Sequence, residues 1–178
     1  TMAAESAHRI AEVLKHKPTL TSPKRGAKEV ADGSVSFEHV SFRYSDDAEA
    51  NALSDINLTI PSGSTLGIVG GTGSSKTSLI QLISRLYDVN DGVVQVGGVD
   101  VRDYDLETLR DAVAVVLQKN VLFSGTIAEN LRWGNPQATD EQVIHAAKLA
   151  QADEFVRQLP GGYDYKIERG GTNVSGGQ

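Results

Sequence analysis

Nine residues from Gly70 to Ser78, GGTGSSKTS, have the types and spacing to bind phosphate. They nearly match the pattern G-x-x-x-x-G-K-[ST], in which the backbone amides of a glycine loop surround phosphate oxygens and a lysine reaches the outer phosphates. Gly70, Lys76 and Thr77 fit this pattern, and Ser75 stands where the second glycine belongs. The segment is therefore a working phosphate site, a disabled one, or a glycine-rich turn beside a solvated lysine.

The flanking residues predict the elements that a phosphate loop requires. Residues 64–70, STLGIVG, form a short apolar run that predicts a buried strand of a parallel sheet. Residues 77–88, TSLIQLISRLYD, carry apolar side chains at helical spacing. A strand, a glycine loop and a helix in this order favour the phosphate site, with the positive end of the helix behind it. The predicted nucleotide-binding residues of the loop are Gly70, Gly71, Thr72, Gly73, Ser74, Ser75, Lys76, Thr77 and Ser78.

Ser75 raises the question of how tightly this loop binds. If the position needs a positive φ or a close approach to phosphate, a Cβ costs about 1–2 kcal/mol. That cost corresponds to a roughly five- to thirty-fold loss of affinity. Alternatively, Ser75 tolerates the geometry, or its hydroxyl contacts a phosphate.

Other elements follow from local patterns. Apolar residues at helical spacing predict a helix over 3–16, followed by a polar linker from 15 to 33. Alternation predicts a half-buried strand that begins near 35 and a second strand over 53–60. Gly97-Gly98 predicts a hairpin, and AVAVVL (112–117) predicts a second buried strand that ends at Gln118. Thr126-x-x-Glu129 and Thr139-x-x-Gln142 are capping boxes, each of which predicts the start of a helix.

Composition excludes several classes of function. A chain of 178 residues with 39% hydrophobic content predicts one domain. The net charge of −6 argues against nucleic acid as a partner. The sequence has no cysteine and four scattered histidines, which makes a zinc site improbable, and it has no apolar run long enough to span a membrane.

Three further segments resemble those of one family. Tyr44 lies in SFRYSDD, Gln118 lies in VLQKNVLFSGTIAENLRWG, and the chain ends in ERGGTNVSGGQ. With the phosphate loop, or Walker A motif, these segments resemble the nucleotide-binding domain of ATP-binding cassette (ABC) transporters. They are most similar to the exporter type, in which membrane helices and ATPase share one chain. The last segment is similar to the family signature L-S-G-G-Q, with Val174 in place of the leucine.

The resemblance implies an α/β fold with a P-loop NTPase-like ABC ATPase core, an N-terminal antiparallel β subdomain and a helical subdomain, with the C-terminal part missing. Residues 1–33 would be the helix and linker from a membrane domain, and 34–178 a partial nucleotide-binding domain. The family's Walker B strand, which lies beside the phosphate-loop strand, and its switch histidine would follow Gln178. Without the Walker B strand, one flank of STLGIVG or AVAVVL would be unpaired.

The resemblance also implies roles for single residues. Tyr44 would stack on adenine, and Thr77 and Gln118 would bind Mg²⁺, with Gln118 also contacting the attacking water. The signature residues would contact the ATP held by the opposite subunit; they are Ser175, Gly176, Gly177 and Gln178. Without the family resemblance, the alternatives are that Tyr44 packs on the core, that Gln118 is a polar residue at a strand end, and that the last residues form a Ser-Gly-Gly turn. Glu168 and Arg169 would contact the membrane domain's coupling helices or form a solvated pair.

The implied function is ATP binding and hydrolysis coupled to export, at the cytoplasmic face of the cell membrane. ATP and Mg²⁺ would be the ligands, and a second ABC subunit and the membrane domain of the same parent chain the partners. The subunit pair would be a homodimer or a heterodimer; Ser75 fits heterodimers in which one ATP site is degenerate. The 178 residues alone would be soluble, bind nucleotide weakly and not hydrolyse it. The alternative is a soluble ABC ATPase without a membrane domain.

Overall fold

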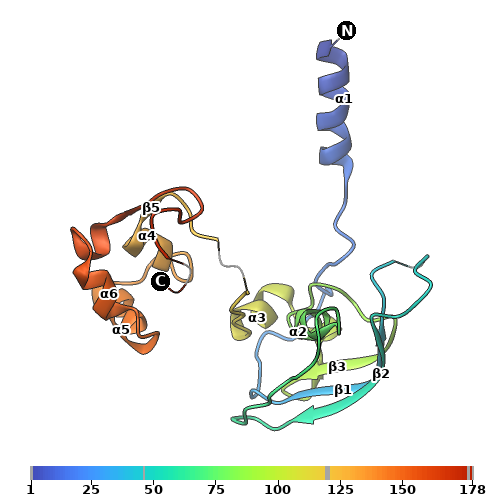
Figure 1. The fold of residues 1–178 in the computed structure, drawn as a ribbon. Helices are drawn as coiled ribbons and strands as arrows, with labels where there is room; N and C mark the ends of the chain where they lie inside the picture. Colours follow the sequence, from blue (N-terminus) through green and yellow to red (C-terminus); the bar gives the residue numbers. More distant parts are fainter. Residues whose placement is uncertain (1, 46, 119–120, 176, 178) are drawn as a thin grey trace. The chain divides into compact units, whose positions relative to one another are not determined.

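The computed structural model describes every residue except 1, 46, 119–120, 176 and 178. The chain divides into two compact units, Thr1–Val115 and Val116–Gln178, which are described in turn. Figure 1 shows the first unit in blue to yellow and the second in orange to red.

An antiparallel sheet forms the centre of the first unit. Its strands are β1 (Val35–Phe42), β2 (Leu53–Ile60), β3 (Asp91–Val96) and β4 (Val99–Asp100), in the order β2-β1-β3-β4. The predicted strands near 35 and over 53–60 are therefore confirmed, and so is the hairpin at Gly97-Gly98, which joins β3 to β4.

A bulge in β1 sets which side chains face the core. The pairing of β1 with β2 shifts between Phe37 and Val40, and His39 has a φ of 50°. Because the bulge adds one residue, Phe37 and Val40 both lie buried although they are three residues apart. Opposite the bulge, a Cβ on Gly92 would lie 2.4 Å from the carbonyl oxygens of Glu38 and His39. Only glycine fits at this position of β3.

Two helices complete the hydrophobic core of the first unit. They are α2 (Lys76–Ile83) and α3 (Leu106–Ala112), which contribute Leu79, Leu82 and Leu109. The short 3-10 helix η1 (Val101–Asp103) leads from β4 to Tyr104, which is fully buried and donates its hydroxyl to the Val96 carbonyl at 2.8 Å. Figure 1 shows α2 and α3 beside the sheet.

The N-terminal segment begins with α1 (Met2–Lys15), as predicted for 3–16. The polar segment that follows is hydrogen-bonded to the rest of the first unit at Ala27. The Ala27 amide donates to the Asp103 carbonyl at 2.8 Å, and the Asp105 amide donates to the Ala27 carbonyl at 3.0 Å. In the described residues, no helix is both long and apolar enough to cross a membrane.

Both predicted buried strands, at 64–70 and at 112–117, are wrong. Residues 64–70 and 112–117 form no strand, and no described residue pairs with them in a ladder. Val69 and Val116 are 98% and 89% exposed. An apolar run becomes a buried strand only where neighbouring backbones satisfy its hydrogen bonds, and the described chain supplies no such neighbour. The helix predicted over 77–88 also ends early, at Ile83, because the chain turns at Arg85, whose φ is 49°.

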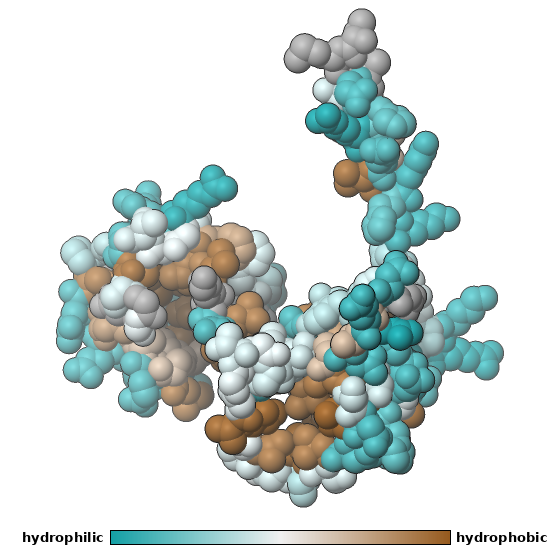
Figure 2. Space-filling view, turned by 45° about the vertical axis from the view of Figure 1, so that its right-hand side comes forward, coloured by the Kyte–Doolittle hydropathy of each residue, from teal (hydrophilic) through white to brown (hydrophobic). Residues whose placement is uncertain are grey.

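The second unit consists of short helices beside a two-stranded sheet. The sheet pairs β5 (Gly125–Thr126) with β6 (Lys166–Ile167). The helices are α4 (Ile127–Leu131), α5 (Asp140–Leu149), α6 (Asp153–Gln158) and the 3-10 helix η2 (Gly162–Asp164). Both predicted capping boxes are confirmed: Thr126 with Glu129 begins α4, and Thr139 with Gln142 begins α5. Ile127, Val156 and Ile167 form the buried core. In Figure 2, hydrophobic surface (brown) is visible on both units.

Candidate functional site

The glycine loop before α2 closes around the ammonium group of Lys76. Lys76 Nζ donates to the carbonyl oxygens of Gly70 at 2.7 Å and Gly71 at 2.8 Å, and to Ser74 Oγ at 3.0 Å. Ser74 Oγ in turn donates to the Gly71 carbonyl at 2.8 Å. A Cβ on Gly70 would lie 2.5 Å from Ser74 Oγ, so a larger residue there would displace the Ser74 hydroxyl from its present position. The result is a small loop with a cation inside it at the start of a helix, which is an arrangement suited to anions.

Ser75 adopts the conformation that makes its side chain costly. Its φ of 57° and ψ of 22° are left-handed, and it is the N-cap of α2 without a side-chain capping hydrogen bond. The positive φ at which a Cβ is costly is thus present at this position. For a residue other than glycine, this conformation costs about 1–2 kcal/mol. Contact of the Ser75 hydroxyl with a phosphate stays a prediction.

Tyr44 lies next to the first turns of α2. Its hydroxyl hydrogen-bonds with Ser78 Oγ at 2.7 Å and donates to Gln81 Oε1 at 3.4 Å. The side chain is still 55% exposed, so surface remains for a ligand. The structure therefore brings Tyr44 to the phosphate loop, although 34 residues separate it from Ser78. Adenine stacking itself stays a prediction.

Two neighbours of Tyr44 were not predicted from the sequence. Tyr87 lies edge-on to Tyr44, and Gln81 contacts its hydroxyl. Both residues lie within the apolar helical pattern of 77–88, but nothing in that pattern indicates which strand end they meet. Only the folded chain shows this contact.

The remaining predicted site residues belong to the second unit. Gln118 is exposed and follows a segment that is not a strand, so its predicted position at a strand end is wrong. Ser175 and Gly177 are also exposed. Gly176 and Gln178 lie outside the described residues. The catalytic and signature roles of these residues stay predictions.

The segment before the signature is held by a network of hydrogen bonds. The amide of Glu168 donates to Asn173 Oδ1 at 3.0 Å, and Asn173 Nδ2 donates to the Lys166 carbonyl at 2.8 Å. The Gly170 amide donates to the Leu122 carbonyl at 3.1 Å. Glu168 also accepts from Thr172 Oγ1 at 3.0 Å, so it has a partner within this loop. Asn173 is the centre of this network, which the sequence alone did not indicate.

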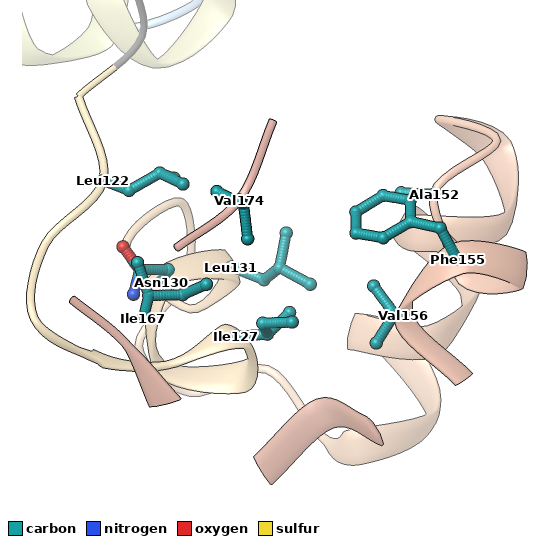
Figure 3. Close-up of a pocket in the computed structure, with 9 residues that line it drawn as sticks. All are labelled: Leu122, Ile127, Asn130, Leu131, Ala152, Phe155, Val156, Ile167 and Val174. Carbon is teal, nitrogen blue, oxygen red and sulfur yellow. The ribbon is translucent and has the colours of Figure 1, made fainter. Parts of the chain in front are cut away.

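Val174, which follows this loop, lines an apolar cavity of about 110 Å³. Figure 3 shows Leu122, Val174 and Leu131 on one side of the space, with Phe155 and Val156 on the other. The position of Val174 among apolar side chains explains why an aliphatic residue suits this position of the signature.

The described residues contain no cluster of three or more His, Asp or Glu side chains that could hold a metal ion. A divalent cation at the phosphate loop would therefore depend on the Thr77 hydroxyl, which is exposed at the start of α2, and on oxygen atoms of the nucleotide. Mg²⁺ is commonly bound in this way, by few protein ligands together with phosphates and water.

Comparison with known proteins identifies the family of this chain. The model of the ABC transporter family matches residues 53–178. The chain therefore belongs to the ABC transporter family.

Individual relatives indicate which type of ABC transporter this chain is similar to. The chain is 42% identical over 178 residues to the "Uncharacterized ABC transporter ATP-binding protein YknV" of Bacillus subtilis, covering 99% of this chain and 29% of that protein. It is 45% identical over 150 residues to a "Putative multidrug export ATP-binding/permease protein" of Staphylococcus aureus, covering 84% and 26%. A solved structure of a bacterial Atm1-family ABC exporter with ATP bound matches 98% of this chain and 30% of its own, with 31% identity and a TM-score of 0.88. The chain thus spans less than a third of the length of these relatives.

Proposed function

We propose that this chain is part of the ATP-binding domain of an ABC exporter, in which ATP binding and hydrolysis are coupled to transport of a substrate across a membrane. The observation that supports this proposal most directly is the loop before α2, which closes around the Lys76 ammonium. Relatives named for multidrug export and a matched exporter structure with ATP bound support the exporter class.

In this proposal the phosphate loop binds the polyphosphate chain of ATP. The amides of 71–77 surround the phosphates, while the Lys76 ammonium moves from the loop carbonyls to the outer phosphate oxygens. Because an ammonium group has three N–H donors, it can exchange the Gly70 and Gly71 carbonyls for phosphate oxygens without losing its hydrogen bonds. Exchange of these partners would open the loop onto phosphate.

Mg²⁺ would be held by the Thr77 hydroxyl together with phosphate oxygens, and we propose Gln118 as a further ligand. When bound, the ion would neutralise charge on the phosphates. Tyr44 would offer an aromatic surface to the adenine base, because this residue remains 55% exposed beside α2. Gln118 would also contact the attacking water.

A second ABC subunit would complete the site. In the proposed dimer, the signature residues Ser175, Gly176, Gly177 and Gln178 contact the ATP bound to the opposite subunit. The membrane domain of the parent protein would be the other partner. The 178 residues contain neither a Walker B segment nor the switch histidine of the family, so we propose that they bind nucleotide weakly and do not hydrolyse it at a useful rate.

The alternative function is that of a soluble ABC ATPase without a membrane domain. Hydrophobic spans encoded upstream of this segment in the parent gene would support the exporter, and their absence would support the alternative. The two functions share the phosphate loop, so nucleotide binding alone does not separate them.

The binding step is tested by titrating the chain with a fluorescent ATP analogue in the presence of Mg²⁺. We expect saturable binding that Lys76→Ala reduces at least tenfold, because a charge-assisted contact to phosphate is lost. Lys24→Ala, which removes an exposed lysine of the same unit, is the matched control and should bind as the wild type does. Equal affinity of the Lys76→Ala variant and the wild type would contradict the proposal.

A further inference from the structure

Three aromatic rings meet at the end of β1. The ring centroids of Phe42 and Tyr44 are 4.8 Å apart, those of Tyr44 and Tyr87 are 5.1 Å apart, and those of Phe42 and Tyr87 are 5.5 Å apart. Tyr44 lies at 75° to Phe42 and at 89° to Tyr87, which are edge-to-face contacts. Edge-to-face pairs at such distances are favourable beyond the apolar area that they bury. We call Phe42, Tyr44 and Tyr87 the aromatic triad.

Both partners of Tyr44 in the triad are anchored. Phe42 is only 2% exposed and belongs to the core of the first unit. Tyr87 lies between Arg85 and Asp88, whose side chains form an ion pair with Arg85 Nε 2.7 Å from Asp88 Oδ1. Arg85 is itself buried. The short segment that carries Tyr87 is therefore held on both sides.

The hydroxyl end of Tyr44 is held by α2. Ser78 Oγ lies 2.7 Å from the Tyr44 hydroxyl, and Ser78 is only 5% exposed. A buried hydroxyl needs a hydrogen-bond partner, so this contact is costly to break. Ser78 comes two residues after Lys76, and the contact therefore joins the Tyr44 ring to the helix that begins at the phosphate loop.

We propose that Tyr87 is a positioning residue for Tyr44: together with the Ser78 hydroxyl, it holds the Tyr44 ring ready for the base of a nucleotide whose phosphates lie in the loop. This inference rests on the proposed function. A side chain that is ordered before binding does not lose rotamer freedom when the ligand arrives, which favours binding. Tyr87 thus contributes to base recognition without contacting the base.

The first test measures the affinity for ATP and for inorganic tripolyphosphate by calorimetry with the whole chain. Tyr87→Leu keeps an apolar side chain but removes the ring. We expect it to weaken ATP binding about three- to tenfold, the cost of ordering one side chain, and to leave tripolyphosphate binding unchanged. In a Tyr44→Ala background, Tyr87→Leu should have no further effect on ATP, because the residue that it positions is absent.

Phe123→Leu is the matched control. Phe123 is an exposed aromatic residue of the second unit that stacks on Trp133 at a centroid distance of 4.6 Å. This variant should change neither affinity. A loss with Tyr87→Leu that is equal for ATP and tripolyphosphate, or that persists in the Tyr44→Ala background, would overturn the proposal.

A second readout needs no nucleotide. The chain has five tyrosines, so ¹³C-labelled tyrosine gives few ring signals, and Tyr44→Phe identifies that of Tyr44. We expect an ordered Tyr44 ring in the wild type and an averaged one in Tyr87→Leu. Equal averaging in both proteins would overturn the positioning role. If the wild type bound neither ligand, the proposed function would fail, and the ring signals would still decide whether Tyr87 positions Tyr44.

Discussion

Lys76 Nζ donates to the Gly70 carbonyl at 2.7 Å, and the chain between these two residues makes its last turn at Ser75 with a φ of 57°. Ser75 is left-handed where the chain turns from the loop into α2, and the lysine that follows it contacts the start of the loop. A residue whose side chain disfavours this conformation thus stands at the turn between the loop and the helix.

Ser75→Gly removes the Cβ from that left-handed position. We expect ATP affinity to rise, by at most the roughly five- to thirtyfold that corresponds to relief of about 1–2 kcal/mol, because part of this strain is already present in the folded loop. The greater freedom of glycine in the unfolded chain offsets about 0.5–1 kcal/mol of any gain in the free energy of unfolding. Titration with a fluorescent ATP analogue measures the affinity. If glycine gave no gain, Ser75 would not weaken the loop.

Gly92 should be the least replaceable glycine of the sheet. In Gly92→Ala the new Cβ meets the carbonyl oxygens of Glu38 and His39 at 2.4 Å, at a φ of 81°. We expect a loss of about 2–5 kcal/mol in the free energy of unfolding, from the backbone strain and the overlap together. Chemical denaturation followed by circular dichroism measures it.

The matched control for Gly92 is Gly98→Ala. Gly98 has a similar φ of 77°, but a Cβ there meets no atom within 4 Å. Its loss should be only the strain of about 1–2 kcal/mol. Equal losses of unfolding free energy in the two variants would show that the bulge of β1 moves and accommodates the added Cβ.

Local sequence patterns predicted most helices, strands and turns of this chain correctly. The wrong predictions concern strands, which depend on pairing with residues far away in the sequence. The strand over 53–60, the hairpin at Gly97-Gly98 and both capping boxes depend on neighbouring residues, and all are present. The runs at 64–70 and 112–117 are apolar enough for buried strands, but a strand also needs a partner that sequence periodicity does not reveal. For the same reason the contact of Tyr44 with Ser78 was not predicted, although both residues were assigned to the site.

Tyr163 and Asp153 form a pair whose effect on stability depends on pH. The Tyr163 hydroxyl donates to Asp153 Oδ1 at 2.7 Å. This hydrogen bond, with that from Arg157, lowers the pKa of Asp153 below its ordinary value of 3.8. Burial, followed by the hydrogen bond to Asp153, raises the pKa of Tyr163 to about 12.

The direction in which each group changes the free energy of unfolding with pH depends on whether the folded or the unfolded state binds more protons. The contribution of Asp153 is present above pH 3.8 and is lost as the pH falls through its lower folded pKa. The contribution of Tyr163 is present below pH 10.0 and is lost as the pH rises toward about 12. In Tyr163→Phe we expect the Asp153 pKa to rise toward 3.8, and the acid loss of stability to become shallower.

The fluorescence of Trp133, the single tryptophan, reports unfolding of the second unit in urea across this acid range. Tyr165→Phe is the control, because the Tyr165 hydroxyl accepts from Asn173 instead of binding a carboxylate. Its acid profile should match that of the wild type. The same steepness in Tyr163→Phe would mean that Arg157 and Lys148, without Tyr163, lower the Asp153 pKa.

Val174→Leu should stabilise the second unit. The Val174 side chain borders the cavity of about 110 Å³, and in Figure 3 it points toward Leu131 with open space between it and Phe155. Leucine adds one methylene that this space can receive, which is worth about 0.8 kcal/mol. We expect the urea midpoint, followed by Trp133 fluorescence, to rise accordingly. Val94→Leu, at a fully buried position of the sheet core, should instead destabilise the first unit by about 1–3 kcal/mol, as overpacking does. A loss of stability in Val174→Leu would mean that the cavity wall cannot accept the longer side chain.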